Sequence, residues 1–447
     1  MSVLLDSHKA SSTAASREVF GWKLADLAWS TFDTTVTTAL LGPYFIALIE
    51  DNGGSVNVAG LSINQASYFP YAVGISSLLQ VLLLPLWGAL ADHTDHKKQL
   101  ILAPAYLGGL ATIGLYFVTG DTILLGGVLF LVASVAFGMA RVVYDSLLPL
   151  IANPDERDRV SAAGSAWGYF GGFAYLLVNL LLFNTMSDDL GLAARLSLAG
   201  AGLWCVVFLA IGPGRYLQDR PAARGKPATI SWISFSFSTL FALLKEMRSK
   251  YPQAFRYLIA YLIFIDAVSA ILALATTFAD EELKIDSGTL LLIILMIQFV
   301  AIPGSIFFGR LAERYGAKKA LILNLSIWSV LVISSYLFMT TERDFWIVGG
   351  CIAIVLGGSR CLSRSLFAQM IPEDEEGQYF SLYQISANGS SWAAPFIFGV
   401  VAQTTGSVRL AILPLAAFFI MAIAVMATVD VRAGALDARP DEYSATS

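Results

Sequence analysis

Two stretches of the sequence share one pattern, a G-x-L-A-acid run followed by paired lysines: Gly88-Ala-Leu-Ala-Asp-His-Thr-Asp-His-Lys-Lys98 and Gly309-Arg-Leu-Ala-Glu-Arg-Tyr-Gly-Ala-Lys-Lys319. They lie 221 positions apart. A second pair, Arg141-Val-Val-Tyr-Asp-Ser-Leu147 and Arg360-Cys-Leu-Ser-Arg-Ser-Leu366, is offset by 219 positions. Two matches at nearly the same offset indicate that the chain is an internal duplication of one long unit.

The repeated stretches lie within or at the ends of long apolar runs, and the composition shows that such runs make up most of the chain. Of the 447 residues 56% are apolar and only 14% are charged, whereas about a quarter of a soluble chain is charged. Twelve apolar runs are long enough to cross a bilayer as helices. Their limits are 22–49, 66–91, 98–118, 122–151, 159–184, 192–216, 253–279, 288–312, 318–340, 344–371, 378–404 and 407–430. A barrel is disfavoured because its strands would alternate in polarity every second residue. The sequence therefore predicts an all-α integral membrane protein.

The charge and cysteine content exclude several functional classes. A net charge of −5 gives no basic surface for nucleic acid. The three cysteines lie in apolar runs and favour neither disulfides nor a metal site. We expect no cofactor and no ATP-driven step, since the chain has no G-x-x-x-x-G-K-[ST] loop. A polytopic membrane enzyme or a receptor remains an alternative, although no nucleophile motif supports catalysis.

Lys and Arg set the expected topology. With both termini in the cytoplasm, 21 of the 28 basic residues fall on cytoplasmic segments. We expect five parts: a disordered cytoplasmic N-terminus (1–21), a six-helix bundle (22–217), a cytoplasmic linker with an amphipathic helix (218–252), a second six-helix bundle (253–430) and a cytoplasmic tail (431–447). Two six-helix halves in parallel orientation are typical of alternating-access transporters.

The two G-x-L-A-acid loops resemble the signature loop of the major facilitator superfamily. Further stretches resemble the autophagy-related vacuolar amino-acid effluxer family and its bacterial relatives: residues 26–45 (DLAWSTFDTTVTTALLGPYF), 144–149 (YDSLLP), 160–172 (VSAAGSAWGYFGG), 357–372 (GGSRCLSRSLFAQMIP) and 378–413. This resemblance implies the twelve-helix major facilitator fold, with two pseudo-symmetric bundles and a central cavity lined by spans 1, 4, 7 and 10. It also implies efflux of amino acids.

Six charged residues inside predicted spans are candidates for a functional role, because a charge within the membrane costs several kcal/mol. They are Asp33, Arg141, Asp145, Asp266, Arg360 and Arg364, and all lie on spans 1, 4, 7 and 10. By the resemblance, these charges mark the transport pathway. Counting residues along each helix places Asp33, Arg141, Asp266 and Arg360 near the middle of the membrane, with Asp145 and Arg364 one turn closer to the cytoplasm.

The residue types suggest how a substrate binds. A guanidinium binds a carboxylate through two hydrogen bonds, and a carboxylate binds an ammonium. We therefore expect Arg360, with Arg141 second, to bind a substrate carboxylate, and Asp33 or Asp266 to bind the amine or to carry a coupling proton. The alternative is purely structural: Arg141 would pair with Asp145, and Asp33 or Asp266 with Arg360.

A second set of charges suggests a cytoplasmic gate. Asp92 and Glu313 end their helices just before the paired lysines. We expect them to form ion pairs in one state of the transport cycle and to release them in the other, with Asp145 and Arg364 as further members of this network. A separate pattern, Gly164, Gly168 and Gly172 at four-residue spacing, predicts a face on which a neighbouring helix approaches closely.

These observations predict a secondary active transporter that exports amino acids or similar zwitterions by alternating access, with proton coupling and as a monomer in the lipid bilayer. The alternative within transport is a proton-coupled exporter of drugs or other organic solutes. We expect the cell (inner) membrane, or the vacuolar membrane if the chain is eukaryotic.

Overall fold

The computed structural model describes residues 2–58, 60–92, 94–151, 157–219, 232–372, 379, 382–383 and 391–438. Almost all of these residues are helical, and eleven helical segments are long and apolar enough to cross a membrane. They coincide with eleven of the twelve expected spans. The twelfth, 378–404, falls partly on residues outside the described ranges. Its described part contains α15 (Ala393–Thr405), whose 13 residues are too few to cross a bilayer alone.

The chain forms two compact units whose boundaries differ from the two sequence halves. Unit 1 comprises Met1–Leu41 and Leu82–Ile233, and unit 2 comprises Gly42–Val81 and Ser234–Ser447. The outer part of the first span and most of the second therefore group with the C-terminal helices. The reason is local packing: Gly42 lies against Thr277 and Phe69, where a larger side chain would collide with the Thr277 hydroxyl.

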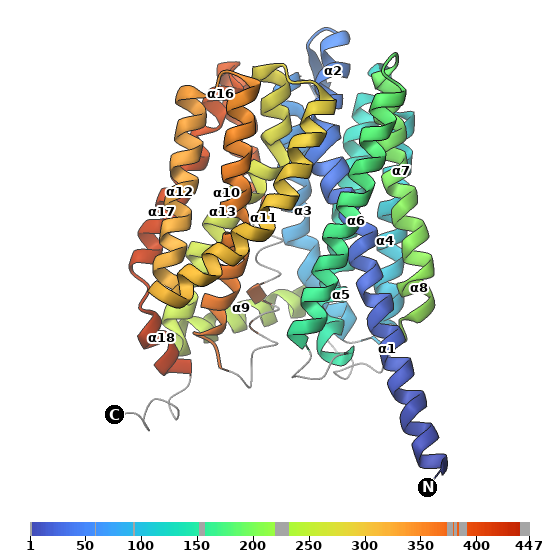
Figure 1. The fold of residues 1–447 in the computed structure, drawn as a ribbon, viewed down its shortest axis with the longest axis vertical. Helices are drawn as coiled ribbons and strands as arrows, with labels where there is room; N and C mark the ends of the chain where they lie inside the picture. Colours follow the sequence, from blue (N-terminus) through green and yellow to red (C-terminus); the bar gives the residue numbers. More distant parts are fainter. Residues whose placement is uncertain are drawn as a thin grey trace. The chain divides into compact units, whose positions relative to one another are not determined.

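Unit 1 is built from four long helices packed around the first span (Figure 1). Its elements are α1 (Ser2–Thr31), the π-helix η1 (Phe32–Leu40), the end of α3 (Gln65–Asp92), α4 (Lys97–Gly114), the short 3₁₀ turns η2 (Leu115–Phe117) and η3 (Gly120–Thr122), α5 (Ile123–Ile151), α6 (Arg157–Thr185), α7 (Leu190–Ile211) and α8 (Pro213–Tyr216). α1 packs against α6 and α7, and α4 packs against α5 and α7. α1 begins at Ser2, so helix runs through most of residues 1–21, for which we expected disorder.

Unit 2 has two kinds of element. A short outer part consists of α2 (Leu41–Asp51), the antiparallel strands β1 (Ser55–Val58) and β2 (Leu61–Asn64), and the start of α3. The helical part consists of α9 (Trp232–Lys250), α10 (Pro252–Leu283), α11 (Ser287–Tyr315), α12 (Ala317–Phe338), α13 (Glu342–Ala368), α15, α16 (Val408–Ala411), α17 (Leu413–Ala427) and α18 (Val431–Ala438). Within it α11 packs on α13, α10 on α17, and α12 on both α13 and α17.

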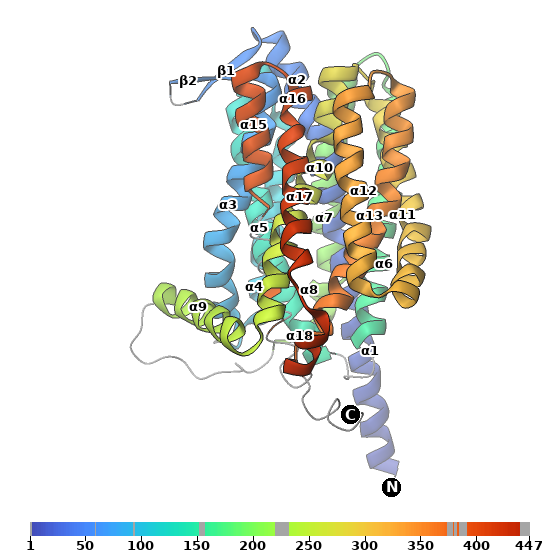
Figure 2. The ribbon, with the colours of Figure 1, turned by 90° about the vertical axis from the view of Figure 1, so that its left-hand side faces the viewer.

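α9 lies within the segment 218–252, where we expected an amphipathic helix. Figure 2 shows that it runs across the direction of α10, α12 and α17 rather than alongside them. A helix that carries Arg248 and Lys250 in its last turn and runs across the bundle has the geometry of a helix lying on a membrane surface.

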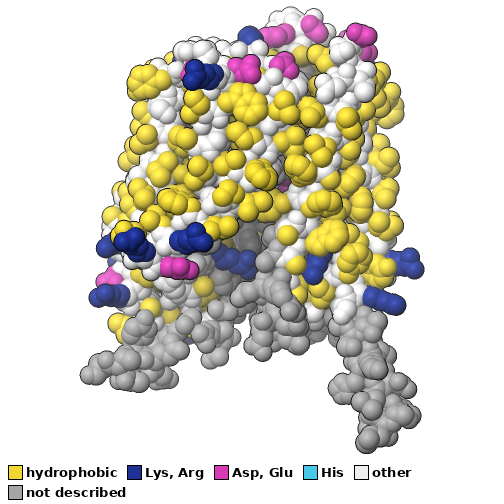
Figure 3. Space-filling model, in the orientation of Figure 1, with side chains coloured by type: hydrophobic (Ala, Val, Ile, Leu, Met, Phe, Trp, Pro, Cys, Tyr) yellow, Lys and Arg dark blue, Asp and Glu magenta, His cyan; other side chains and the backbone are white. Residues whose placement is uncertain are grey.

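The outer surface of the bundles is apolar, as lipid contact requires. Over the helices of unit 2, at the left of Figure 3, hydrophobic side chains cover most of the visible face. Lys and Arg gather near its lower edge, and Asp and Glu near its upper edge. Phe299 on α11 and Phe338 on α12 are 72% and 73% exposed, which is favourable only if acyl chains surround them.

Candidate functional site

An ion pair inside the membrane-spanning part of unit 1 joins the first and fourth spans. Nη2 of Arg141 on α5 donates to Oδ2 of Asp33 on η1 at 2.6 Å. The two side chains are 27% and 50% exposed, so the pair is accessible from one side. Asp33 lies in the first turn of the π-helix, a rare conformation that is frequent at functional sites.

A second carboxylate lies two turns earlier on the first span. Oδ2 of Asp26 accepts a 2.6 Å hydrogen bond from the hydroxyl of Tyr144, and Oδ1 accepts one of 3.2 Å from the indole of Trp29. The ring of Tyr144 also stacks on Trp22 at 4.4 Å, and the Trp22 indole donates to the backbone carbonyl of Tyr144. Both oxygens of Asp26 are thus held by neutral donors within an aromatic cluster.

The glycines of α6 determine how closely the first span approaches. A Cβ on Gly164 would lie 2.8 Å from Oδ2 of Asp26, and one on Gly171 would lie 2.5 Å from the carbonyl oxygen of Leu27. A Cβ on Gly172 would lie 2.8 Å from the Thr34 side chain. The close approach expected from the glycine spacing is therefore confirmed, and its partner is α1 with η1.

Carboxylates outnumber bases around Arg141. Asp33, Asp26 and Asp145 all interact electrostatically with its guanidinium. The face of Trp29 lies 5.7 Å from the guanidinium carbon, and the buried Nε of Arg141 has no hydrogen-bond partner. Three carboxyl groups around one guanidinium provide acceptors that suit a cationic group.

The structural alternative, in which Arg141 pairs with Asp145, is not the arrangement found: Arg141 pairs with Asp33. Asp145 is exposed on the same helix, whereas Asp33 reaches Arg141 from the neighbouring span at hydrogen-bond distance. The reason is geometric, since two residues four apart on one helix point along its surface, while a residue on a packed neighbour can point directly at the guanidinium.

In unit 2 the expected site residues lie in different surroundings. Asp266 on α10 is 3% exposed, and its Oδ2 accepts a 3.0 Å hydrogen bond from the amide of Ala394. Its other oxygen is buried without a partner, so Asp266 forms no ion pair with Arg360 among the described residues. Arg360 and Arg364 on α13 are both exposed.

A tyrosine cluster lies beside these arginines. The rings of Tyr261 and Tyr383 stack at 4.0 Å, and the hydroxyl of Tyr257 donates to the backbone carbonyl of Ser363 at 2.7 Å. Arg360 interacts electrostatically with Tyr261, and Arg364 with Tyr383. Two exposed guanidinium groups with phenol hydroxyls nearby form a surface suited to a carboxylate or another anion.

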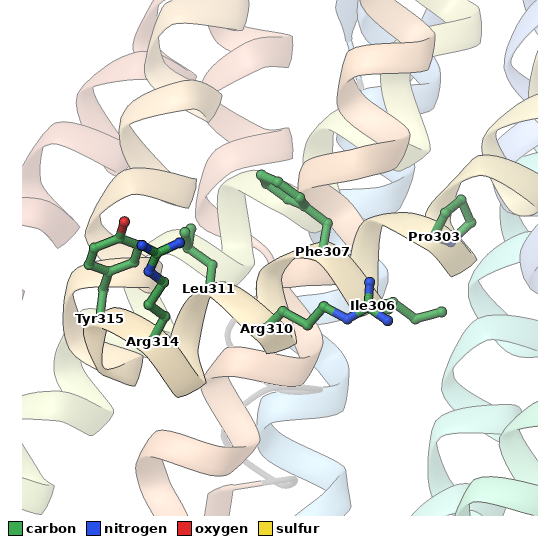
Figure 4. A pocket seen from close by; sticks show the side chains of 7 residues that line it. All are labelled: Pro303, Ile306, Phe307, Arg310, Leu311, Arg314 and Tyr315. Atoms are coloured by element: carbon green, nitrogen blue, oxygen red, sulfur yellow. The ribbon is translucent and has the colours of Figure 1, made fainter.

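The expected gate residues are only partly described. The side chain of Asp92 lies outside the described residues, although its backbone ends α3. Glu313 is exposed on the last turns of α11. Figure 4 shows Arg310 and Arg314 on the same stretch of α11, extending over a pocket of about 520 Å³ lined by Pro303, Ile306, Phe307, Arg310, Leu311, Arg314 and Tyr315. This pocket contains none of the intramembrane acids.

Sequence reasoning missed the partners of Asp26. Tyr144 lies between the two charged residues of α5, and Trp22 and Trp29 lie one turn on either side of Asp26. Aromatic residues flanking an intramembrane acid at helical spacing were the available signal. Within the described ranges, no three His, Cys, Asp or Glu side chains lie together as a metal site would require.

Comparisons with known proteins agree with this architecture. The family described as "Vacuole effluxer Atg22 like" matches residues 15–439 of the chain. The uncharacterized MFS-type transporter YxiO of Bacillus subtilis is 29% identical over 91% of this chain and 94% of its own length. Autophagy-related protein 22 of Coccidioides immitis is 24% identical over 98% of this chain and 82% of its own length.

Solved structures share the fold. The nucleoside transporter NupG superposes with a TM-score of 0.68 at 15% identity, covering 93% of this chain and all of its own. A D-xylose-proton symporter gives the same TM-score at 11% identity, covering 92% of this chain and 97% of its own. At these identities the likeness establishes the fold alone, which is the two-bundle architecture expected from the repeats.

Proposed function

The chain belongs to the Vacuole effluxer Atg22 like family within the major facilitator superfamily, and we propose that it exports amino acids or similar small zwitterions by alternating access, linked to protons. The observation that carries this proposal is the Arg141–Asp33 pair, which lies within two membrane-spanning segments with both side chains partly exposed. A buried pair could be structural, but charges in a membrane that remain accessible are expected to meet a polar solute.

We assign the substrate carboxylate to Arg360. It is exposed on α13, and phenol groups lie nearby. Arg141, whose guanidinium donates to Asp33, is the second candidate. The excess of acids around Arg141 supports Asp33 as the group that binds the substrate amine, with Asp266 as the other candidate for the amine or for a coupling proton.

The test is counterflow in proteoliposomes with a panel of amino acids at two pH values. We expect saturable exchange of at least one amino acid by the wild type, and a loss of about tenfold or more in Arg360→Ala, equal to roughly 1.4 kcal/mol of binding or more. Arg343→Ala, at the opposite end of the same helix, is the matched control. Normal amino-acid flux in Arg360→Ala would refute the role of Arg360, and no flux of any amino acid in the wild type would refute the substrate class.

A second candidate function is proton-coupled export of organic cations such as drugs. The observation that favours it is the cluster of Asp26, Asp33 and Asp145 around one arginine, together with the face of Trp29, which can bind a cation. Competition experiments separate the two functions. A zwitterion exporter is inhibited by amino acids but not by amines that lack a carboxylate, whereas a cation exporter is inhibited by the amines.

The protein is a multi-pass integral membrane protein, and we propose the cell membrane as its site, with both termini in the cytoplasm. The distribution of 21 of the 28 Lys and Arg residues supports this orientation. Cysteine labelling of a single residue in the C-terminal tail of intact cells tests it. Modification without permeabilisation would place the tail outside and reverse the topology.

A further inference from the structure

Asp266 is a carboxyl group buried near the middle of a membrane-spanning helix. It lies fourteen residues after Pro252, the first residue of α10, which is about 21 Å along the helix. Only 3% of the residue is exposed. Oδ2 accepts a hydrogen bond from the amide of Ala394, and Oδ1 is buried with no partner among the residues that the structure describes.

No described cation compensates this carboxyl group. Of the elements that pack against α10, α15 and α17 contain no ionisable residue. Arg409 of α16 is bound to Glu282 and to two backbone carbonyls. None of the other charged or titratable groups on these elements influences Asp266. They are Arg360, Arg364, Cys351, Glu342, Arg343 and Asp344 on α13; Arg310, Glu313, Arg314 and Tyr315 on α11; and Arg432 and Asp437 on α18. Only burial and backbone amides act on Asp266.

An ionised carboxylate in these surroundings would be strongly destabilised, because neither water nor a cation replaces its hydration shell. A protonated carboxyl group has no such penalty and still accepts the Ala394 bond through its carbonyl oxygen. We propose that Asp266 is the proton-carrying group of the transporter, protonated in the conformation described here. This inference rests on the proposed proton-linked transport and divides the roles left open above: Asp266 carries the proton, and Asp33 binds the amine.

The contrast with Asp33 supports this division. Asp33 is half exposed and bonded to a guanidinium. Two carboxyl groups in corresponding spans are thus placed in opposite environments. Asp33 lies beside a cation, and Asp266 is buried with no described cation beside it.

The hydrogen bond between Asp266 and Ala394 links release of the proton to the contact between α10 and α15. Ala394 is the second residue of α15, and the N-cap residue Trp392 makes no side-chain cap of its own. Asp266 therefore caps the free amide end of a neighbouring helix. When α10 and α15 separate at this point, water reaches both oxygens, and hydration of the ionised carboxylate replaces its hydrogen bond to the amide. Proton release is then coupled to the opening of this contact.

Asp266→Asn tests the proposal, because asparagine keeps the size of the side chain and an oxygen acceptor for Ala394 but cannot exchange a proton. In proteoliposomes with Asp266→Asn, we expect amino-acid accumulation driven by a pH gradient to fall relative to the wild type. The factor of this loss should be at least ten times the factor by which counterflow falls. Asp286→Asn, which alters an N-cap acid just outside α11, is the matched control and should change both activities equally. Equal losses of the two activities in Asp266→Asn would overturn the proposal.

A spectroscopic measurement tests the proton directly and does not depend on substrate. In the infrared spectrum of the wild type we expect a carboxylic acid C=O band that persists at neutral pH and is absent from Asp266→Asn. Absence of such a band in the wild type would overturn the assignment even if the variant failed to insert. The band together with no amino-acid counterflow would refute the proposed substrate and leave the proton site standing. Counterflow without any response to pH would refute the coupling role.

Discussion

The guanidinium of Arg141 lies 2.6 Å from the carboxylate of Asp33, and this bond connects α5 to the π-helix in the first span. The bond joins two membrane-spanning segments of unit 1 and remains partly exposed. The pair therefore has two consequences that can be separated, one for the stability of the bundle and one for transport.

For stability, we expect Asp33→Asn and Arg141→Gln each to lower the free energy of unfolding by roughly 1–3 kcal/mol, since each leaves one charge without its partner. The partial exposure of the pair keeps this below the cost at a fully buried site. The double variant should lose less than the two single losses combined, with a coupling of roughly 1 kcal/mol. Thermal unfolding in detergent measures all four proteins, and strictly additive losses would show that the bond contributes nothing.

The sequence predicted much of this arrangement but not that bond. The G-x-L-A-acid repeat at an offset of 221 predicted the duplicated fold, and the rarity of charge in membranes singled out Arg141, Asp33 and Asp266. Spacing along one helix shows which residues share a face. It does not show the rotation of that helix against its neighbours, which decides that Arg141 meets Asp33 rather than Asp145.

Two other features of the structure could not be predicted from the sequence, for related reasons. The π-helix of Phe32–Leu40 adds an extra residue per turn, and its run of threonines resembles an ordinary helical segment in sequence. The grouping of Gly42–Val81 with the C-terminal helices depends on contacts between segments more than 200 residues apart. Both are consequences of tertiary packing, which local patterns do not encode.

At Gly171, α6 lies so close to α1 that we expect no larger side chain to fit there. A Cβ there would lie 2.5 Å from the carbonyl oxygen of Leu27 and 3.0 Å from its Cα, and backbone atoms cannot move aside easily. We expect Gly171→Val to lower the free energy of unfolding by roughly 2–3 kcal/mol. Gly350→Val is the matched control, because a Cβ at Gly350 of α13 meets nothing within 4 Å. Thermal midpoints in detergent compare the two, and equal shifts would indicate that valine in a helix, rather than the collision, is responsible.

Neutralising the acids that end α3 and α11 should slow transport without preventing insertion. We expect Asp92→Asn and Glu313→Gln each to reduce the initial rate roughly fivefold, as a coupling near 1 kcal/mol between states implies. Asp51→Asn, an exposed acid at the end of α2, is the control. Initial rates normalised to the amount of inserted protein are the measurement. If both variants transport as fast as the control, Asp92 and Glu313 have no role in a gate, and the paired lysines beside them act only as topology determinants.

Two side chains bond the outer hairpin of unit 2 to α15: that of Asn64, which donates to the carbonyl of Ala402 at 3.2 Å, and that of Gln403. The amide oxygen of Gln403 accepts from the backbone N–H of Asn64, and its NH₂ group donates to the carbonyl of Ser62, both at 2.9 Å. These bonds occupy backbone groups of β2 that its partner strand does not reach.

We therefore expect Gln403→Ala to increase hydrogen exchange of the Asn64 amide about tenfold, which corresponds to roughly 1.4 kcal/mol of local stability. Gln369→Ala is the matched control, since Gln369 is exposed and its one hydrogen bond, to Ser365, is long at 3.5 Å. Exchange of residues 55–64, followed by mass spectrometry, gives the comparison. If the amide is protected equally in all three proteins, the hairpin is held instead by the packing of Tyr71 against Phe396, whose rings lie 5.6 Å apart, and Phe396→Ala should then release it.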